Sequence, residues 1–295
     1  MCKISILMPA YNAERYISNA IDSVVNQSFE DWELIIIDDC STDSTGKISD
    51  KYSLADSRIK VYHMLSNIGI SKAKNEALNR AKGDYVAFCD DDDVMDKDSL
   101  LNNMSLVEKY NPQVVRWSYK TIKVDEDERI YSVVDCKCEK GIYLSANQIF
   151  RNYNNVHTML SCDWTALYKK EILDANNIRF DERFRYGGED TLFNIELLNY
   201  VDKMIMNDEC YYSWYLRKKH STTAKRDVNF CYSMIEVAKR ERDIIFKYCD
   251  DADTIWHRYR EFYEKLIIDY AAKLPEFENQ RINEIIFSIR NGTIW

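Results

Sequence analysis

Glycine and proline are both scarce in this chain, which has seven glycines and three prolines among its 295 residues. Neither a G-x-G-x-x-G segment nor a G-x-x-x-x-G-K-[S/T] segment occurs in the sequence. Such segments form the glycine loops that hold phosphates in dinucleotide-binding proteins and in P-loop NTPases. Their absence argues against both of these classes of nucleotide-binding protein.

Positive charge and metal-binding patterns are also in short supply. The 40 Lys and Arg residues are outnumbered by 49 Asp and Glu residues, and the net charge of −9 argues against a general nucleic-acid binder. There are four histidines, and of the nine cysteines only Cys136 and Cys138 stand close together, so no zinc-binding spacing is found. We expect free thiols, as in a protein of the reducing cytoplasm.

Long apolar runs are missing as well. No stretch reaches the roughly 18 apolar residues that a membrane span requires. The N-terminal segment "MCKISILMPAYN" has one Lys and a short apolar run, which is not the pattern of a signal peptide. We therefore expect a cytoplasmic protein, and the inner face of the membrane stays open as its place of action.

The first hundred residues alternate between short apolar runs and helical patterns. The apolar runs are predicted to be buried strands: residues 4–8, "WELIIIDD", "IKVYHM" and "DYVAFCD". Apolar residues at helical spacing lie between them, over residues 16–25 and in "GISKAKNEALNRAK". This alternation predicts parallel β-α-β units, and the near-continuous apolar strands predict a sheet that is covered on both faces.

Polar and aromatic residues gather where these strands end. The three ends are Pro9-Ala10-Tyr11-Asn12, Asp38-Asp39 and Asp90 to Asp93. Ligands of such sheets bind beyond the carboxyl ends of the strands. Four adjacent carboxylates repel one another, so the last group is either exposed to water or holds a cation. Its position at the end of a buried strand favours the cation.

The pattern changes beyond residue 97. A helix is predicted for "KDSLLNNMSLVEKY", and two strands are predicted on either side of Asp125 to Glu128, which we interpret as a solvated loop tip. The segment "KMIMNDECYYSWYLR" is predicted to form two short strands. From Arg226 onward the chain is predicted to be helical.

Four segments, in this order, resemble glycosyltransferase family 2: "ISILMPAYNAERYISNAIDSVVNQSFEDWELIIIDDCSTDST", "NIGISKAKNEAL", "GDYVAFCDDDDV" and "GGEDTLFNIELL". The resemblance implies the GT-A fold, an α/β fold with a mostly parallel central sheet flanked by helices. We expect a catalytic domain over residues 1–226, with a nucleotide-sugar-binding half at 1–100 and an acceptor-binding half at 101–226. A C-terminal helical subdomain is expected over residues 227–295.

The resemblance implies that Tyr11 and Asp39 bind the base of a nucleotide sugar. Tyr11 offers an aromatic face, and Asp39 offers an acceptor for a ring N–H group, which suits the uracil of a UDP-sugar. From the residues alone, Tyr11 could equally pack on the first helix and Asp39 could cap the turn that follows it. The further donor-binding residues expected from these segments are Pro9, Asn12, Asn67, Lys74, Asp90 and Asp91. Lys74 stands where the family more usually has Arg.

Aligned with the D-x-D motif of the family, the four aspartates take different roles. The resemblance implies that Asp90 lies near the ribose, that Asp91 occupies the variable position, and that Asp92 binds Mn²⁺ or Mg²⁺. Such a cation stabilises the negative charge on a leaving diphosphate. Asp91-x-Asp93 also spells the motif, so the register stays open by one residue.

The E-D pair of "GGED" is the expected catalytic pair. In inverting members of the family the Asp is the general base, so the resemblance implies that Asp190 takes the acceptor proton and that Glu189 orients the acceptor. We infer a single displacement with inversion at the anomeric carbon. From the residues alone, both acids could simply favour a helix N-terminus.

Two later segments allow several interpretations. In the basic segment "LRKKHSTTAKR", His220 and Ser221 are candidates for contacts with the donor diphosphate, while a solvated loop and a patch for anionic lipid headgroups are the alternatives. The aromatic and basic residues near the C-terminus suit peripheral contact with a membrane, a dimer surface, or helices packed on the catalytic domain.

The predicted function is metal-dependent, inverting transfer of a sugar, of hexosyltransferase type, from a UDP-sugar to a hydroxyl group of a glycan or lipid-linked acceptor. Bacterial surface polysaccharide synthesis is the expected setting. A sugar nucleotidyltransferase is one alternative. A G-x-G-T-R motif near the first strand is typical of that class, however, and this chain has "PAYN" at that place. A non-catalytic sugar-nucleotide-binding protein is the other, which the presence of both acidic motifs disfavours.

Overall fold

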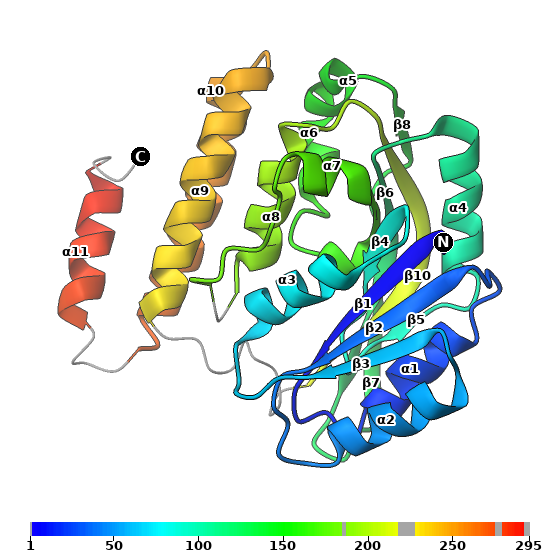
Figure 1. Cartoon of the computed structure of the whole chain (residues 1–295). Coiled ribbons are helices and arrows are strands. Elements are labelled where there is room, and N and C mark those ends of the chain that lie inside the picture. Colours follow the sequence, from blue (N-terminus) through cyan, green and yellow to red (C-terminus); the bar gives the residue numbers. More distant parts are fainter. Residues whose placement is uncertain (1, 185–186, 218–227, 275–278, 292–295) are drawn as a thin grey trace.

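The computed structural model describes residues 2–184, 187–217, 228–274 and 279–291. A ten-stranded sheet lies at the centre of the molecule, with helices against it (Figure 1). The strands are β1 Ile4–Ala10, β2 Trp32–Asp38, β3 Ile59–His63, β4 Tyr85–Phe88, β5 Val94–Met95, β6 Val114–Val124, β7 Ile130–Cys136, β8 Gly141–Tyr143, β9 Ala166–Lys169 and β10 Met204–Leu216. The α/β architecture predicted from the alternating patterns is confirmed.

The helices of the described ranges are α1 Ile17–Val25, α2 Thr45–Ala55, α3 Ile70–Arg80, α4 Ser99–Tyr110, α5 Ala146–Arg151, α6 Tyr153–His157, α7 Lys170–Ala175, α8 Glu189–Leu198, α9 Val228–Tyr248, α10 Ala252–Ala271 and α11 Asn279–Arg290, with a 3-10 turn η1 at Asp163–Thr165. They include three short ones, α5, α6 and α7, that the sequence patterns did not predict. None of these helices has the length and apolarity of a membrane span.

The sheet brings the ends of the first strands to one edge. Its order is β3-β2-β1-β4-β9-β6-β10-β5, with β7 on β6 and β8 on β10, and the strands from β3 to β4 are all parallel. The register pairs Ala10 with Asp38 and Leu7 with Phe88. All seven residues of β1 are buried, which explains its continuous apolar sequence. The carboxyl ends of β1, β2 and β4 therefore meet at one site.

The segment predicted as two short strands is one long strand. β10 runs parallel to β6 and carries register shifts between Asn207 and Cys210 and between Cys210 and Tyr212. Such a bulge adds unpaired residues and bends a strand without ending it. The polar residues at the bend, which suggested a break in the sequence, lie within the strand.

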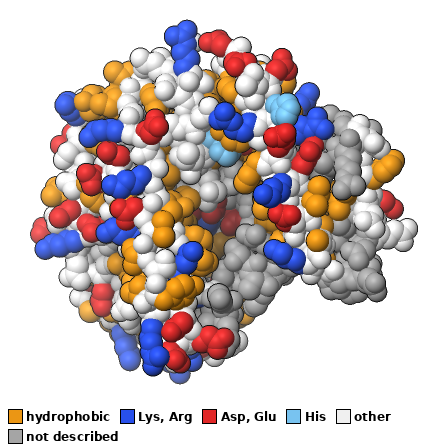
Figure 2. Space-filling view, turned by 180° about the vertical axis from the view of Figure 1, so that it is seen from behind, with side chains coloured by type: hydrophobic (Ala, Val, Ile, Leu, Met, Phe, Trp, Pro, Cys, Tyr) orange, Lys and Arg blue, Asp and Glu red, His pale blue; other side chains and the backbone are white. Residues whose placement is uncertain are grey.

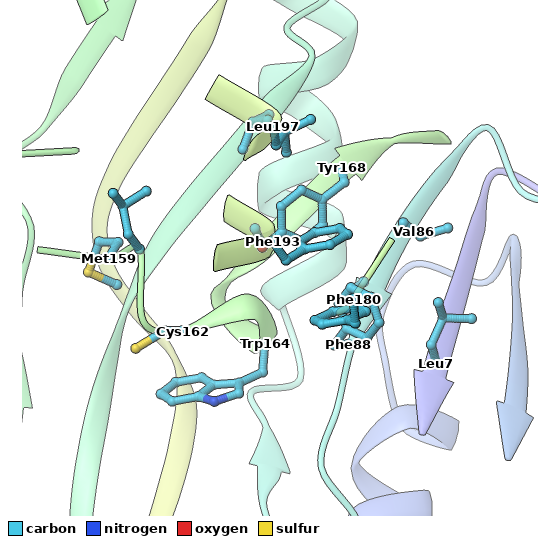
Figure 3. Packing of buried hydrophobic residues seen from close by; sticks show 14 of the residues in the cluster. Leu7, Val86, Phe88, Met159, Cys162, Trp164, Tyr168, Phe180, Phe193 and Leu197 are labelled. Carbon is cyan, nitrogen blue, oxygen red and sulfur yellow. The ribbon is translucent and has the colours of Figure 1, made fainter. Parts of the chain in front are cut away.

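Aromatic rings fill the core between β4 and α8 (Figure 3). Phe180 and Phe193 stack with their ring centroids 4.3 Å apart, and Phe88 meets Phe180 edge-to-face at 5.3 Å. Phe88 ends β4, two residues before the first Asp of the run, and Phe193 lies one turn after Asp190 in α8. Packing of these rings therefore sets the distance between the two acidic motifs.

The C-terminal helices pack against the preceding part of the chain through a buried carboxylate. In Figure 1, α9 lies beside α8, and α10 packs on α9. Glu241 of α9 is fully buried, accepts hydrogen bonds from the hydroxyls of Tyr153 and Tyr263, and lies 3.1 Å from Nε2 of His157. One side chain thus links α6, α9 and α10.

Glu241→Gln is expected to lower the free energy of unfolding by about 1–3 kcal/mol, because it removes the negative charge to which the buried tyrosine hydroxyls and His157 donate. Burial acts to raise the pKa of Glu241, but His157 and the tyrosine hydroxyls hold it below its ordinary value of 4.5. A carboxyl with a depressed folded pKa stabilises the fold above its unfolded pKa and loses that effect as the pH falls through the folded pKa.

The difference in Tm between wild type and Glu241→Gln should therefore be largest near neutral pH and should shrink as the pH falls below about 4.5. Thermal unfolding followed by circular dichroism measures it. Glu236→Gln, on the same helix but partly exposed, is the matched control. Equal Tm values for the two variants at neutral pH would contradict a structural role for Glu241.

Candidate functional site

Tyr11 and Asn12 form the turn at the end of β1. The Tyr11 side chain is 46% exposed, and its backbone N–H donates to Oδ2 of Asp91 at 2.9 Å. Asn12 adopts a left-handed backbone (φ 53°), and its Oδ1 accepts from the Thr42 N–H at 2.8 Å. Pro9 is a buried β1 residue paired with Ile37. The turn thus leaves the Tyr11 ring available to a ligand.

Asp39 organises the neighbouring loop. Its two carboxylate oxygens accept from the backbone N–H groups of Ile68 at 2.6 Å and Gly69 at 2.9 Å. Asn67, exposed in the same loop, donates from Nδ2 to the Asp39 carbonyl at 3.3 Å. The Asp39 side chain is therefore bound to the loop that begins α3. The turn after Asp39 is capped by Asp38 instead, whose Oδ1 accepts from the Ser41 N–H at 3.0 Å.

Asp91 and Asp93 hold parts of the backbone together. Asp91 accepts from Tyr11, as described, and so joins the ends of β1 and β4. Asp93 is buried, and its Oδ1 accepts from the Tyr215 N–H of β10 at 2.8 Å. These two carboxylates therefore fix the backbone around the site, at the turn after β1 and at β10.

Asp90 and Asp92 face different cations. Oδ2 of Asp92 lies 3.0 Å from Nη1 of Arg217, while the Asp92 side chain is 36% exposed. Burial raises the pKa of Asp90 to about 6, with Lys74 opposing the rise and the Asp190 and Asp92 carboxylates adding to it. Asp90 therefore faces the acid cluster around Lys74, whereas Asp92 faces Arg217.

The hairpin tip between β6 and β7 contacts this same edge. The tip residues are exposed, as predicted, but Glu128 accepts a hydrogen bond from the Tyr16 hydroxyl at 2.7 Å. Oε2 of Glu128 also lies 3.3 Å from Nε of Arg217, whose guanidinium covers the Tyr16 ring at 4.0 Å. Glu128 is thus exposed like the rest of the tip, but the hairpin folds back and this carboxylate also holds Arg217.

Lys74 is the centre of a buried acid cluster. Its side chain is 2% exposed, and Nζ lies 2.6 Å from Oδ1 of Asp190, 2.8 Å from Oδ2 of Asp163 and 4.0 Å from Oε1 of Glu189. Figure 2 shows acidic side chains recessed in a hollow near the centre of one face of the molecule. The single ammonium group of Lys74 therefore forms ion pairs with carboxylates of both η1 and α8.

Glycine places the E-D pair at the start of α8. Gly188 has φ 92°, and a Cβ added there would lie 2.3 Å from Cε of Met234 in α9. The chain thus turns sharply against α9 directly before its acidic pair, at a position that favours glycine.

Burial raises the pKa of Glu189 to about 7, with the adjacent Asp190 adding to the rise and Lys74 opposing it.

Helix α3 also holds the segment that leads to this turn. Asn75 exchanges two hydrogen bonds of 2.9 Å with the backbone of Phe180, and the Ser71 hydroxyl donates to the Phe184 carbonyl at 2.6 Å. Asn75, which matches the family segment in sequence, therefore has a structural contact. Lys74, its neighbour in α3, reaches the acids from the same side.

The structure brings most of the predicted site residues to one edge of the sheet. His220 and Ser221 lie outside the described residues. Asp163, Arg217 and Glu128 are important partners that the sequence patterns did not identify as site residues. For Asp163 the available signal was an isolated acid in the otherwise apolar and small segment "MLSCDWTALY". Trp164 beside it is buried and stacks on Tyr212 at 4.6 Å, so it belongs to the core.

The described residues contain no group of three or more His, Cys, Asp or Glu side chains that could hold a metal ion by itself. Asp92 nevertheless has the chemistry that Mn²⁺ and Mg²⁺ prefer, since both favour carboxylate oxygen and often take only one or two carboxylates plus phosphate and water. Its pairing with the Arg217 cation shows that the position accepts positive charge. The residues therefore fit a cation shared with a bound diphosphate.

Comparison with known proteins identifies the family. The family model described as "Glycosyl transferase family 2" matches residues 5–176. The uncharacterized glycosyltransferase EpsJ of Bacillus subtilis is 30% identical over 211 residues, which cover 71% of this chain and 60% of EpsJ. The poly(ribitol-phosphate) beta-N-acetylglucosaminyltransferase TarS of Staphylococcus aureus is 28% identical over 216 residues, covering 72% of this chain and 35% of TarS. The chain thus spans less than two thirds of either relative.

Solved structures show the same fold. Residues 1–349 of S. aureus TarS in complex with UDP superpose with a TM-score of 0.72 at 22% identity, covering 99% of this chain and 88% of that one. A mannosyltransferase from Pyrobaculum calidifontis, in complex with GDP-Man and Mn²⁺, gives 0.55 at 17% identity, covering 83% and 64%. The fold predicted from the resemblance is confirmed.

Proposed function

Because the chain belongs to glycosyl transferase family 2, we propose that it transfers a sugar, of hexose type, from a UDP-sugar to a hydroxyl group of a glycan or lipid-linked acceptor. The observation that carries this proposal is the meeting of two acidic motifs at the carboxyl edge of the sheet. Asp90 and Asp92 follow β4, Glu189 and Asp190 begin α8, and Lys74 contacts the second pair and interacts electrostatically with Asp90.

The donor-binding part of the proposal uses the ends of β1 and β2. The exposed Tyr11 ring stacks on the base, and Asp39 accepts from its ring N–H group. A carboxylate has about four lone-pair sites, so the two backbone bonds of Asp39 leave capacity for a ligand. Pro9, Asn12, Asn67 and Asp91 shape this pocket, and Asp90 binds the ribose. The ammonium group of Lys74 already contacts two carboxylates of the protein, so we do not assign it to the donor.

Asp92 would hold Mn²⁺ or Mg²⁺ together with the diphosphate of the donor. Bound there, the cation would supply neutralisation of the charge on the leaving diphosphate. Arg217 lies beside Asp92 and carries a second positive charge at this position. His220 and Ser221 remain predicted diphosphate contacts. The names of the solved neighbours, which include UDP in one case and Mn²⁺ in another, support this choice of ligands.

Asp190 is the base in the proposed reaction. The acceptor oxygen attacks the anomeric carbon, its proton passes to the Asp190 carboxylate, and the bond from the anomeric carbon to the diphosphate oxygen breaks. The bonding electrons leave with UDP, and the configuration at the anomeric carbon inverts. Glu189, whose pKa is raised by burial to about 7, lies beside Asp190 and orients the acceptor.

The setting that we propose is bacterial surface polysaccharide synthesis. Support comes from the printed names of relatives, which include the poly(ribitol-phosphate) transferase TarS and a putative teichuronic acid biosynthesis glycosyltransferase. The predicted halves 1–100 and 101–226 and the helical subdomain 227–295 remain our proposed division. Packing of α9 and α10 on the catalytic region supports the interpretation of the C-terminal helices as part of the same molecule.

Donor binding should depend on both the metal and Asp92. In a thermal-shift screen of UDP-GlcNAc, other UDP-sugars and GDP-mannose, one UDP-sugar with Mn²⁺ should raise Tm, by the equivalent of about 2.7 kcal/mol at 100 times its Kd. Asp92→Asn should remove the part of this shift that requires Mn²⁺. Asp84→Asn, an exposed acid at the opposite end of β4, is the matched control.

A UDP-sugar that stabilises Asp92→Asn as much as wild type, with the same metal dependence, would contradict the metal assignment. Release of pyrophosphate from a sugar 1-phosphate and UTP, without release of UDP from a UDP-sugar, would indicate a nucleotidyltransferase and contradict the proposed function.

Asp190→Asn should leave donor binding within about twofold of wild type and should lower transfer by about 10²–10⁴-fold, the usual contribution of a general base. UDP release from the selected UDP-sugar, with water as the acceptor, measures the change. Asp202→Asn, an exposed acid beyond the other end of α8, controls for the loss of charge. Near-normal turnover by Asp190→Asn would show that another group takes the proton.

A further inference from the structure

The position of Lys74 differs from that of a ligand-binding lysine. Both of its closest partners are carboxylates of the protein, and its side chain is almost completely buried. Burying an ammonium group is costly unless it is paired, so each contact is needed to keep it there. To reach a donor, Lys74 would have to leave both partners.

Asp163 anchors this lysine. It is fully buried, which keeps it from the acceptor, and it lies on η1 at the end of a tightly held loop. Arg116 of β6 donates from Nη1 to the carbonyls of Met159 at 2.8 Å and Cys162 at 3.2 Å. Asn194 of α8 donates to the Leu160 carbonyl at 2.7 Å. These bonds fix the backbone of the loop that carries Asp163. Among the described residues, neither carboxylate oxygen of Asp163 has a hydrogen-bond partner, so the Lys74 ammonium at 2.8 Å is the charge that compensates it.

We propose that Lys74, anchored by Asp163, is a positioning residue that orients the carboxylate of Asp190 for proton transfer. The inference rests on the proposed function, in which Asp190 is the base. Lys74 donates to Oδ1 of Asp190 and leaves Oδ2 for the acceptor hydroxyl. Since misplacing a reacting group by about 1 Å can cost about 10²-fold in rate, a fixed hydrogen bond to one oxygen has a direct effect on turnover.

Charge gives the same lysine a second effect. Three carboxylates lie within 4.0 Å of the Lys74 ammonium, Asp163 on η1 and Glu189 and Asp190 on α8. Asp90 after β4 and Tyr168 of β9 are the other ionisable groups that act on them electrostatically. Burial and Asp190 raise the pKa of Asp163, and Lys74 opposes that rise as it does for Glu189 and Asp90. Removing the ammonium group would therefore make Asp163 and Glu189 retain protons to higher pH.

The test compares Lys74→Met, Lys74→Arg and Asp163→Asn. Each change is made in the wild-type protein and in the Asp190→Asn variant. Lys74→Met should lower kcat by about 10–100-fold, leave the Kd for UDP with Mn²⁺ within about twofold, and move the acidic limb of the pH–kcat profile to higher pH. Lys74→Arg, which keeps the charge, should restore most of the activity and the position of the limb. Lys72→Met, on the exposed face of α3, is the control.

Asp163→Asn keeps the shape of the anchor and should lower kcat about tenfold without weakening UDP binding, so the inference stays testable if Lys74→Met does not fold. In the Asp190→Asn background, neither change should lower the residual rate further, because both act through Asp190.

The outcomes separate the two hypotheses. If Asp190→Asn keeps near-normal turnover, the assignment of the base fails, whatever Lys74 does. If Asp190→Asn loses turnover but Lys74→Met and Asp163→Asn keep wild-type kcat and pH profile, or if their losses multiply with that of Asp190→Asn, the positioning role is overturned. A weakened Kd for UDP with unchanged kcat in Lys74→Met would instead assign Lys74 to the donor.

Discussion

A buried positive charge is the constraint on which the site depends. The ammonium group of Lys74 is shielded from water, so the fold must supply it with anions. Its partners come from separate elements: Asp163 from η1 and the E-D pair from α8, while Lys74 itself comes from α3. Any arrangement that satisfies the lysine must therefore bring these elements together at the carboxyl edge of the sheet, and the four carboxylates around it can then coexist.

Packing and the C-terminal helices maintain this arrangement. The stacked rings of Phe180 and Phe193, with Phe88 against them, set the distance between β4 and α8. Gly188 turns against Met234, and Glu241 ties α9 to α6, which precedes the loop of Asp163. The family model ends at residue 176, yet the elements that hold the proposed base and its support extend well beyond it. The C-terminal helices are thus connected to the proposed chemistry through packing.

Two cations divide the acids of the site into two groups with different proposed tasks. Arg217, held by Glu128 and Tyr16, faces Asp92 at the side where the donor diphosphate is proposed to bind. Lys74 faces Asp163, Glu189 and Asp190 at the side where the acceptor is proposed to bind. Asp90, two residues before Asp92, interacts electrostatically with Lys74 and Asp190 of one group and with Asp92 of the other. In the proposed reaction, this separation would let one edge of the sheet carry charge neutralisation and proton transfer without the two sets of carboxylates competing for one cation.

Local patterns in the sequence determined the elements and the edge at which the site lies. A strand covered on both faces must be apolar throughout, so β1, β2 and β4 were predictable, and with them the placement of Tyr11, Asp39 and the aspartate run. The single bent strand β10 was not, because a bulge resembles a break between two strands. Only the tertiary structure decided which acid each cation neutralises. Arg217 and Asp92 are 125 positions apart, and Lys74 and Asp190 are 116. Partners at such separations depend on which elements fold side by side, a property that residue spacing along the chain does not contain.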